Sequence, residues 1–222
     1  MKKKAARKPP PPPRLIGPPD FVHENACRTE GLWPVAGVDE AGRGPLAGSV
    51  AVAAVILNPA DLPIGVDDSK ALTAPRREEL FDLILAKALA VSIAFASADE
   101  IDTHNIRMAT LRAMARALAA LHARPKIALI DGRDVPPGLT CQSRAIIAGD
   151  AACLSIAAAS IVAKVTRDRM MARLDAHCPG YGFAQHAGYA TQAHRDAIAT
   201  LGPSPFHRRS FSPIKIPDLF AE

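Results

Sequence analysis

Short runs of consecutive apolar residues alternate along this chain with segments in which apolar residues recur at helical spacing. Val35 to Val38 and Ser49 to Leu57 are two such runs, and the glycine-rich turn at 42–45 predicts that they form a buried hairpin. Two further runs, Ala90 to Ala96 and Ile127 to Ile130, also predict strands. The hydrophobic pattern therefore indicates a sheet.

Three other segments predict helices. Thr73 is a candidate N-cap, with Pro75 in the first turn and apolar residues following at helical intervals. Leucine and methionine residues within 111–121 form one stripe of a second amphipathic helix. A third helix is expected to open at Asp150 and to reach Leu174 without Gly or Pro, and its alanine-rich first half suits close packing on a sheet. This order of elements predicts a mixed sheet covered by helices.

Composition and charge indicate one globular unit with a basic tail. The 222 residues are 49% hydrophobic and 22% charged, and no apolar run reaches the roughly 18 residues that span a bilayer. The formal net charge is +5, but residues 1–19 contain six lysines and arginines and no acid, so the rest of the chain sums to −1. Bulk charge is therefore weak evidence for a polyanionic partner. The proline-rich tail 1–19 is expected to be disordered.

The amino terminus and the cysteines bear on the compartment. The first basic residues are followed by prolines instead of an apolar stretch, which excludes a secretory signal. The four cysteines have no CxxC spacing and are typical of reduced thiols. We therefore expect a cytoplasmic protein without a membrane partner.

Several acidic residues lie where predicted elements end or begin, and each alone has an ordinary explanation. Asp39 and Glu40 could form a solvated turn after a strand, and Asp131 is followed by a glycine, as in many turns. Asp150 is a preferred N-cap type, and Asp168 could be a surface acid. Taken singly, each position is more often structural than catalytic.

Taken together, these carboxylates indicate a different interpretation. Two positions close strands and a third opens a helix, and a mixed sheet can bring those ends together, an arrangement that suits metal-assisted phosphoryl chemistry. Asp39 and Glu40 are adjacent, so a regular strand would point them to opposite faces. The sequence leaves open whether the strand bends there or one of the two acts from the side.

Other catalytic arrangements fit less well. A zinc site could be imagined from His177, Cys178, His186 and His194, but such ligands normally come in tighter pairs. The chain contains neither a G-x-S-x-G elbow nor a Walker loop, and the glycines at 42 and 44 have the wrong spacing for a dinucleotide fingerprint.

A series of motifs resembles the signature of type 2 ribonuclease H, the bacterial ribonuclease HII. The segment V-A-G-V-D-E-A-G-R-G-P-L-A-G at 35–48 is similar to that signature almost letter for letter. The further matches are D-S-K at 68–70, I-D-G at 130–132, G-D at 149–150, A-S-I-V-A-K-V-T-R-D at 159–168, Y-G-F at 181–183, G-Y at 188–189, Thr191 with His194, and P-F-H-R-R-S-F at 205–211. The likeness extends over most of the chain, from about Phe21 to Pro213.

The resemblance implies a ribonuclease H-like three-layer α/β fold, with a mixed central sheet flanked by helices and a C-terminal helical and loop extension. Together with the change of composition after Leu174 and the basic tail, it leads us to expect a tail 1–19, a catalytic core 20–174 and a C-terminal substrate-recognition segment 175–222.

The resemblance also implies a set of site residues. The catalytic and metal-binding carboxylates would be Asp39, Glu40, Asp131 and Asp150, with Mg²⁺ or Mn²⁺ as the cofactor. The substrate-binding residues would be Gly42, Arg43 and Gly44 through their backbone, Tyr189 through its ring, and Lys70 and Lys164 at phosphates. Whether Asp168 assists the metal site is left open.

The implied function is an endoribonuclease that hydrolyses the RNA strand of RNA–DNA hybrids and cuts 5′ of ribonucleotides embedded in duplex DNA. Hydrolysis would use two metal ions and leave 5′-phosphate and 3′-hydroxyl ends, in the service of DNA replication and repair. The expected partner is nucleic acid, and a monomer is expected.

Two alternatives remain beside this function. Another metal-dependent nuclease of the same superfamily, such as a resolvase or an exonuclease, is disfavoured by the loop 42–44 together with Tyr189. A noncatalytic nucleic-acid-binding module, with the basic tail as its main element, is disfavoured by the four intact carboxylates. The sequence departs from the family where His-Lys-Gly-Tyr-Gly-Thr is replaced by H-A-G-Y-A-T at 186–191, which is expected to affect substrate affinity and not the chemistry.

Overall fold

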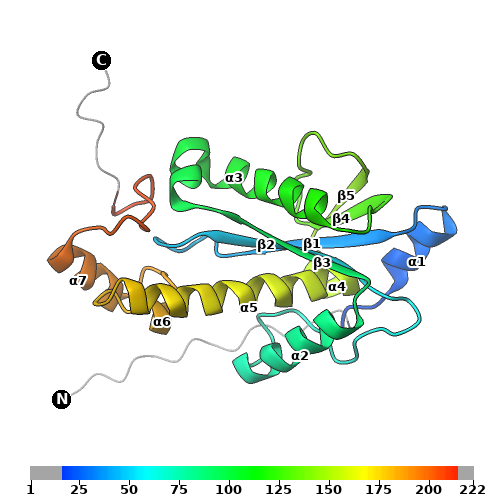
Figure 1. Cartoon of the computed structure of the whole chain (residues 1–222), viewed down its shortest axis with the longest axis horizontal. Coiled ribbons are helices and arrows are strands. Elements are labelled where there is room, and N and C mark those ends of the chain that lie inside the picture. Colours follow the sequence, from blue (N-terminus) through cyan, green and yellow to red (C-terminus); the bar gives the residue numbers. More distant parts are fainter. Residues whose placement is uncertain (1–16, 215–222) are drawn as a thin grey trace.

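The structure is a computed structural model that describes residues 17–214, so most of the predicted tail, residues 1–16, and the segment 215–222 lie outside the described residues. Figure 1 shows the order of its elements along the chain. The helices and strands are α1 (Val22–Thr29), β1 (Val35–Ala41), β2 (Val50–Ile56), α2 (Ala74–Lys87), β3 (Ala90–Ala96), α3 (Ala98–Ala120), β4 (Ile127–Asp131), β5 (Gln142–Ile146), α4 (Gly149–Ala152), α5 (Leu154–His177), α6 (Phe183–His186) and α7 (Gln192–Leu201).

The sheet is mixed, as the order of elements predicted. Its strand order is β3-β2-β1-β4-β5, and β1 pairs with β2 in the predicted antiparallel hairpin. β2 and β3 are also antiparallel, whereas β1, β4 and β5 run parallel to one another. Because neighbouring parallel strands end at the same edge of a sheet, the carboxyl ends of β1 and β4 lie side by side.

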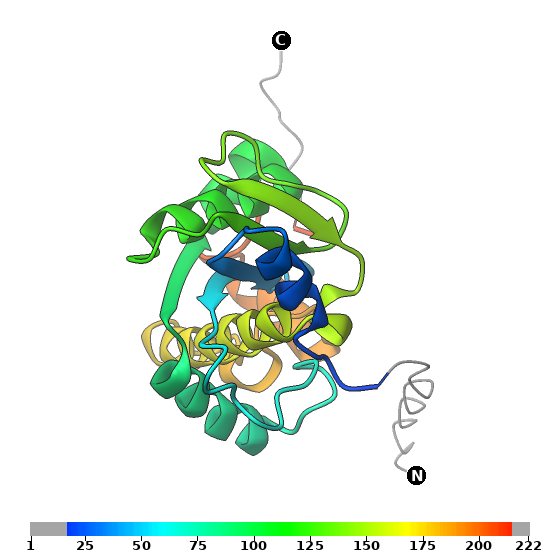
Figure 2. The same ribbon diagram turned by 90° about the vertical axis from the view of Figure 1, so that its right-hand side faces the viewer.

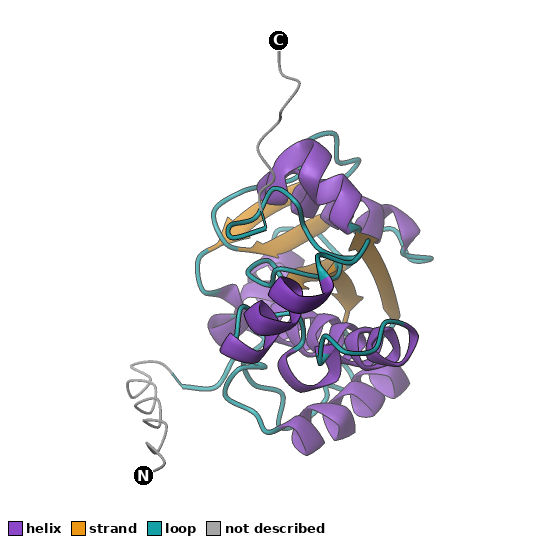
Figure 3. Cartoon of the chain, turned by 90° about the vertical axis from the view of Figure 1, so that its left-hand side faces the viewer, coloured by secondary structure: helices purple, strands orange, loops and turns teal. Residues whose placement is uncertain are grey.

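Helices cover both faces of this sheet, which confirms the three-layer α/β arrangement. In Figure 1, α3 lies on one side of the strands, and α2 and α5 lie on the other; Figures 2 and 3 show the same layers from the two ends. One buried cluster joins Val38, Val52 and Ile130 to Met114 of α3. A second joins Ala53 and Val55 to residues of α2 and α5. Each face of β2 therefore contributes to a separate core.

The predicted close packing of the alanine-rich helix on the sheet depends on a glycine of β1. A Cβ atom added at Gly37 would lie 2.1 Å from the carbonyl carbon of Ser155, so no side chain fits between β1 and α5. Ala157, Ala158 and Ala159 of α5 are completely buried. Small residues on both elements thus let their backbones approach closely.

The prediction that the long helix opens at Asp150 is wrong for the first turn. Asp150 belongs to the separate one-turn helix α4, and the long helix α5 begins at Leu154, after Cys153 in an extended conformation. Tertiary contacts hold this break: Cys153 bridges to Asp20, and the buried carboxylate of Glu24 accepts a hydrogen bond from the Ser155 amide at 2.7 Å. Helix α1, which contains Glu24, therefore provides a cap for the amino-terminal end of α5.

The remaining elements refine the prediction. β5 was not predicted, because this edge strand is mostly exposed and lacks an apolar pattern. The predicted amphipathic stripe lies in α3, which is kinked at Asn105 (φ 63°). Thr73 caps α2, as predicted. No helix within residues 17–214 is long and apolar enough to cross a membrane.

Candidate active site

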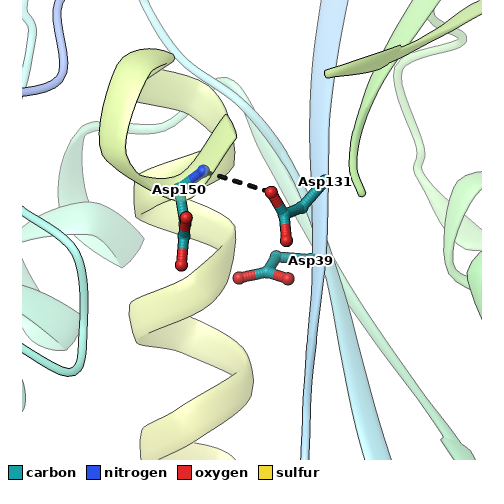
Figure 4. A group of neighbouring side chains, drawn as sticks. All are labelled: Asp39, Asp131 and Asp150. Carbon is teal, nitrogen blue, oxygen red and sulfur yellow. Dashed lines mark hydrogen bonds between the residues drawn. The ribbon is translucent and has the colours of Figure 1, made fainter. Parts of the chain in front are cut away.

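Three of the four predicted carboxylates converge at the carboxyl edge of β1 and β4. Asp39 comes from β1, Asp131 ends β4, and Asp150 lies in α4, as Figure 4 shows. One oxygen from each of these residues lies within 4.8 Å of the others. The Oδ1 atom of Asp131 accepts hydrogen bonds from the amides of Gly149 at 2.7 Å and Asp150 at 3.4 Å. Asp131 thereby holds α4 against the strand ends.

Glu40 lies beside this cluster but is not part of it. The strand stays regular, with Asp39 opposite Ala53 and Glu40 opposite Val52, so the two acids face different cores of the sheet. Asp39 points to the α5 side and is 3% exposed. Glu40 points to the α3 side, where Arg43 Nη1 lies 3.4 Å from its Oε1 atom. The strand therefore does not bend, and Glu40 approaches the site from its flank.

The cluster concentrates negative charge with few compensating cations. Burial raises the pKa of Asp39 well above its usual range, and the neighbouring carboxylates of Glu40 and Asp131 raise it further. Burial and Asp150 likewise raise the pKa of Asp131. Lys70 is the near cation, with Nζ 2.8 Å from Oδ2 of Asp150. Three converging carboxylates that destabilise one another's charged forms fit a divalent cation that prefers oxygen ligands.

All the predicted substrate-binding residues line one cleft next to this cluster. Its volume is about 260 Å³, and its walls include Asp39, Glu40 and Asp131. The predicted residues on its walls are Gly42, Arg43, Gly44, Lys70, Lys164 and Tyr189. Tyr189 is 48% exposed, and its Cε1 atom lies 3.7 Å from the place where a Cβ of Gly44 would be. A loop and an aromatic ring thus lie next to each other in the cleft that the acids also line.

The two lysines and Asp168 form local ion pairs. Lys70 contacts Asp150, as described above, and the Nζ atom of Lys164 lies 2.6 Å from Oδ1 of Asp168, four residues further along α5. Asp168 is therefore paired with a cleft lysine and is not a member of the aspartate cluster. This contact agrees with the ordinary interpretation of Asp168 as a structural acid.

Two buried arginines beside the segment 42–48 had no role assigned from the sequence, and Arg167 also lines the cleft. Arg167 is 1% exposed and donates to the carbonyl groups of Ala47, Ser49 and Ala187. Arg208 is completely buried and donates to carbonyl groups of the segment 42–48. Both arginines lie within the matched motifs, but their burial could not be deduced from residue type.

Two of the histidines considered for zinc, His186 and His194, belong to a histidine stack behind Tyr189. The third, His177, lies at the end of α5 and hydrogen-bonds to the carbonyl oxygen of Arg173. The Nδ1 atom of His194 lies 2.9 Å from the carbonyl oxygen of Tyr189, and its Nε2 atom lies 3.0 Å from Nε2 of His207. The Ser204 amide donates to Nδ1 of His207 at 2.9 Å. His194 must therefore carry its proton on Nδ1 and His207 on Nε2, with both rings neutral. Within residues 17–214, only the aspartates form a group suited to a metal ion.

Comparisons with known proteins agree on one family. A sequence profile of the family "Ribonuclease HII" matches residues 36–214. Ribonuclease HII of Sinorhizobium medicae is 61% identical over 197 residues, which are 89% of this chain and 91% of that protein. Ribonuclease HII of Mesorhizobium japonicum is 58% identical over 203 residues, 91% of this chain and 88% of that protein.

Solved structures give the same result. The crystal structure of ribonuclease H2 from Pyrococcus horikoshii superposes with a TM-score of 0.68 at 29% identity, covering 81% of this chain and 94% of that one. These matches include the whole aspartate cluster and the cleft beside it. The chain belongs to the ribonuclease HII family, whose members are metal-dependent endoribonucleases that act on RNA–DNA hybrids.

Proposed function

We propose that this protein cuts duplex DNA on the 5′ side of embedded ribonucleotides, in addition to hydrolysing the RNA strand of RNA–DNA hybrids, and that it uses two divalent metal ions. One observation carries the proposal. The acid cluster Asp39, Asp131 and Asp150 borders a cleft whose other walls include the loop 42–44 and Tyr189. A site for phosphate chemistry and a site able to recognise a sugar are therefore contiguous.

The acids would hold the metal ions, Mg²⁺ or Mn²⁺. Asp39, Asp131 and Asp150 offer converging oxygens, and Glu40 offers a carboxylate at their flank. When bound, the ions would neutralise the negative charge of the scissile phosphate, lower the pKa of the attacking water and stabilise the leaving 3′ oxygen. The Gly149 amide fixes the orientation of the Asp131 carboxylate, which keeps one ligand in place before the ions arrive. The products would carry 5′-phosphate and 3′-hydroxyl ends.

Recognition of the ribonucleotide would come from the cleft residues that do not belong to the acid cluster. Backbone groups of Gly42, Arg43 and Gly44 can reach the 2′-hydroxyl, the group that distinguishes RNA from DNA. The exposed ring of Tyr189 can stack on the sugar at the junction. Since Tyr189 comes from the C-terminal segment 175–222, this segment would act in substrate recognition, beside the catalytic core 20–174.

Lys70 and Lys164 would contact phosphates of the substrate. Both line the cleft, and both have an acidic partner, Asp150 and Asp168 respectively. These pairs keep the ammonium groups at the cleft wall, and a phosphate oxygen can share the same donors because each ammonium group has three. The binding of Lys70 to Asp150 also places its charge next to the acid cluster.

The proposal is tested by incubating the protein with a duplex that contains a single ribonucleotide, with and without Mg²⁺. The expected result is one cut on the 5′ side of the ribonucleotide that requires Mg²⁺, leaving a 3′ end that a DNA polymerase can extend. An all-DNA duplex of the same sequence is the matched control. Cleavage of long hybrids without cleavage at the single ribonucleotide would contradict the finer part of the proposal.

A further inference from the structure

The side chain of Arg208 makes an unusual set of contacts. It is completely buried, and it forms no salt bridge within the described residues. Its guanidinium instead donates five hydrogen bonds to four backbone carbonyls, those of Gly42, Arg43, Pro45 and Gly48, at distances of 2.6 to 3.0 Å. A guanidinium has five N–H groups, so its capacity as a donor is fully used.

These contacts fix the orientation of two peptide groups in the loop that lines the cleft. In a trans peptide, the C=O group and the following N–H group point in opposite directions. Carbonyls of Gly42 and Arg43 that point at Arg208 therefore turn the amides of Arg43 and Gly44 away from it. Neither amide donates a hydrogen bond to another backbone or side-chain group in the part of the chain that the structure describes.

The loop lies between Arg208 and the cleft. Gly42, Arg43 and Gly44 line the cleft, whereas the fully buried Arg208 does not. The side of the loop opposite Arg208 is thus the side that a substrate can reach. The two unpaired amides are available there as donors to an oxygen atom of the substrate.

The position of Arg208 is itself fixed. Its backbone amide donates to Leu46, and the amide of Gly48 donates to Phe206, so the two segments are joined on both sides of the arginine. The guanidinium also lies 5.1 Å from the ring centroid of Phe211. An ammonium group has no planar fork and only three donors, so lysine could not bind the four carbonyls in this arrangement.

We propose that Arg208 is a positioning residue for ribonucleotide specificity, which sets the peptide planes of 42–44 so that the amides of Arg43 and Gly44 donate to the ribose 2′-hydroxyl. Arg208 acts from behind the loop and does not touch the substrate. The inference rests on the function proposed above. It adds the element that would give a flexible, glycine-containing loop a fixed set of donors.

The test compares Arg208→Lys and Arg208→Gln with the wild type, and Arg209→Gln is the matched control because Arg209 is adjacent and exposed. Binding to a duplex with one ribonucleotide and to an all-DNA duplex is measured in Ca²⁺, so that affinity is read apart from cleavage. Cleavage is then measured in Mg²⁺, and the melting temperature of each variant is recorded. The experiments on Arg208→Gln are repeated at low temperature, where a destabilised variant stays folded.

The expected result is a loss of preference. Both Arg208 variants should bind the all-DNA duplex within about twofold of the wild type, while their preference for the ribonucleotide duplex falls by about tenfold, the size expected for the loss of one or two hydrogen bonds. The Mg²⁺ concentration at half-maximal rate should stay unchanged, and Arg209→Gln should keep the full preference. A parallel fall in melting temperature, DNA binding and cleavage, or failure of both variants to fold, would make Arg208 a general structural residue and overturn the proposal.

The wild-type measurements separate this inference from the proposed function. A wild-type protein that does not distinguish the two duplexes would contradict the function itself. A wild-type preference that survives intact in both folded Arg208 variants would contradict only the role of Arg208.

Discussion

Gly42 and Gly44 lie in the same loop but are required for different reasons. Gly42 has a φ of +97°, and a Cβ there would lie 1.8 Å from Nε of the buried Arg167. Gly44 has no such strain, and a Cβ there would meet only the ring of Tyr189, at an ordinary 3.7 Å. Both glycines line the cleft, but of the two only Gly42 is also required by the fold.

This difference predicts that alanine at one position lowers stability, whereas alanine at the other lowers cleavage without lowering stability. Gly42→Ala should destabilise the protein by about 2 kcal/mol or more, because the methyl group clashes and the backbone is strained. Gly44→Ala should leave the melting temperature within about 2 °C of the wild type and still lower cleavage at a single ribonucleotide by about tenfold, since the methyl group narrows the cleft. Thermal unfolding and initial rates check both. Equal losses of stability in the two variants would contradict the assignment.

Asp131 has both a structural and a proposed catalytic role, and one substitution separates them. Asp131→Asn should lower cleavage by at least about 100-fold, because an amide lacks the charge that a metal ligand needs. The fold should be kept, since the Oδ1 atom of asparagine can still accept the hydrogen bond from Gly149. Circular dichroism and cleavage rates in Mg²⁺ measure the two effects. A variant that cleaves within a few-fold of the wild type would reduce Asp131 to a turn residue.

The exposed ring of Tyr189 predicts a loss of recognition without a loss of stability. Tyr189→Ala should lower cleavage of a duplex with one ribonucleotide by more than about tenfold, because stacking on an aromatic ring contributes about 1 to 3 kcal/mol per base. Binding to all-DNA duplex and the melting temperature should barely change, because Tyr189 is 48% exposed. Tyr181, the other tyrosine, is buried and donates to Gly202, so Tyr181→Phe is a control for loss of a tyrosine hydroxyl in the same segment.

At the scale of elements, the apolar pattern was sufficient to predict the central strands of the sheet. It was insufficient to predict the edge strand and the break between two helices. The four strands with apolar runs are confirmed, and β5 escaped prediction because it is exposed. The break between α4 and α5 could not be predicted, because Glu24 and Asp20 impose it from more than a hundred residues away. The matched register of β1 and β2 settled which faces Asp39 and Glu40 occupy, a question that sequence alone left open.

The candidate site shows the same limit. Its acids and glycines could be named from motifs, and the structure gathers them around one cleft, while their individual roles stay predictions. The supporting residues were beyond sequence reasoning. Arg208 binds carbonyls that precede it by 160 to 166 positions, and nothing in a local pattern distinguishes it from the exposed Arg209 beside it.

The histidine stack behind Tyr189 predicts a pH-dependent stability of this end of the molecule. Burial, and to a smaller extent the nearby His194 and His186, lower the pKa of His207 from 6.5 to about 4, although the Ser204 hydrogen bond opposes this. As the pH falls through about 6.5, His207 therefore becomes protonated in the unfolded chain but stays neutral in the folded chain. The stabilisation from neutral His207 is complete above pH 6.5 and is lost as the pH falls towards 4, by about 3 kcal/mol in all.

Urea unfolding at a series of pH values measures this effect. The variant His207→Gln keeps a donor towards His194 and an acceptor for Ser204 but does not titrate, so its free energy of unfolding should fall less steeply between pH 6.5 and 4 than that of the wild type. His23→Gln is the matched control, because His23 is exposed on α1. Identical pH profiles for the wild type and His207→Gln would show that His207 does not titrate with the fold.

At the scale of the whole molecule, the metal-free protein has mutually repelling carboxylates at the centre of its sheet. Asp39 is buried on the central strand, and two further carboxylates lie within 4.8 Å of it. The folded state raises the pKa of Asp39 well above its usual value, so at neutral pH this carboxyl lowers stability instead of adding to it. A buried carboxylate that serves to bind a cation is expected to lower the free energy of unfolding when no cation is bound.

Asp39→Asn is therefore expected to stabilise the metal-free protein while abolishing cleavage. Asparagine keeps an acceptor for the Glu40 amide and removes one charge, which should raise the free energy of unfolding by about 1 kcal/mol and the melting temperature by about 2 to 4 °C. Mg²⁺ should raise the melting temperature of the wild type by mass action and shift that of the variant much less. Calorimetry with and without Mg²⁺ measures both, and Asp168→Asn is the control, because that acid pairs with Lys164 outside the cluster. A less stable Asp39→Asn with an undiminished response to Mg²⁺ would mean that Asp39 supports the fold and that the ions bind elsewhere.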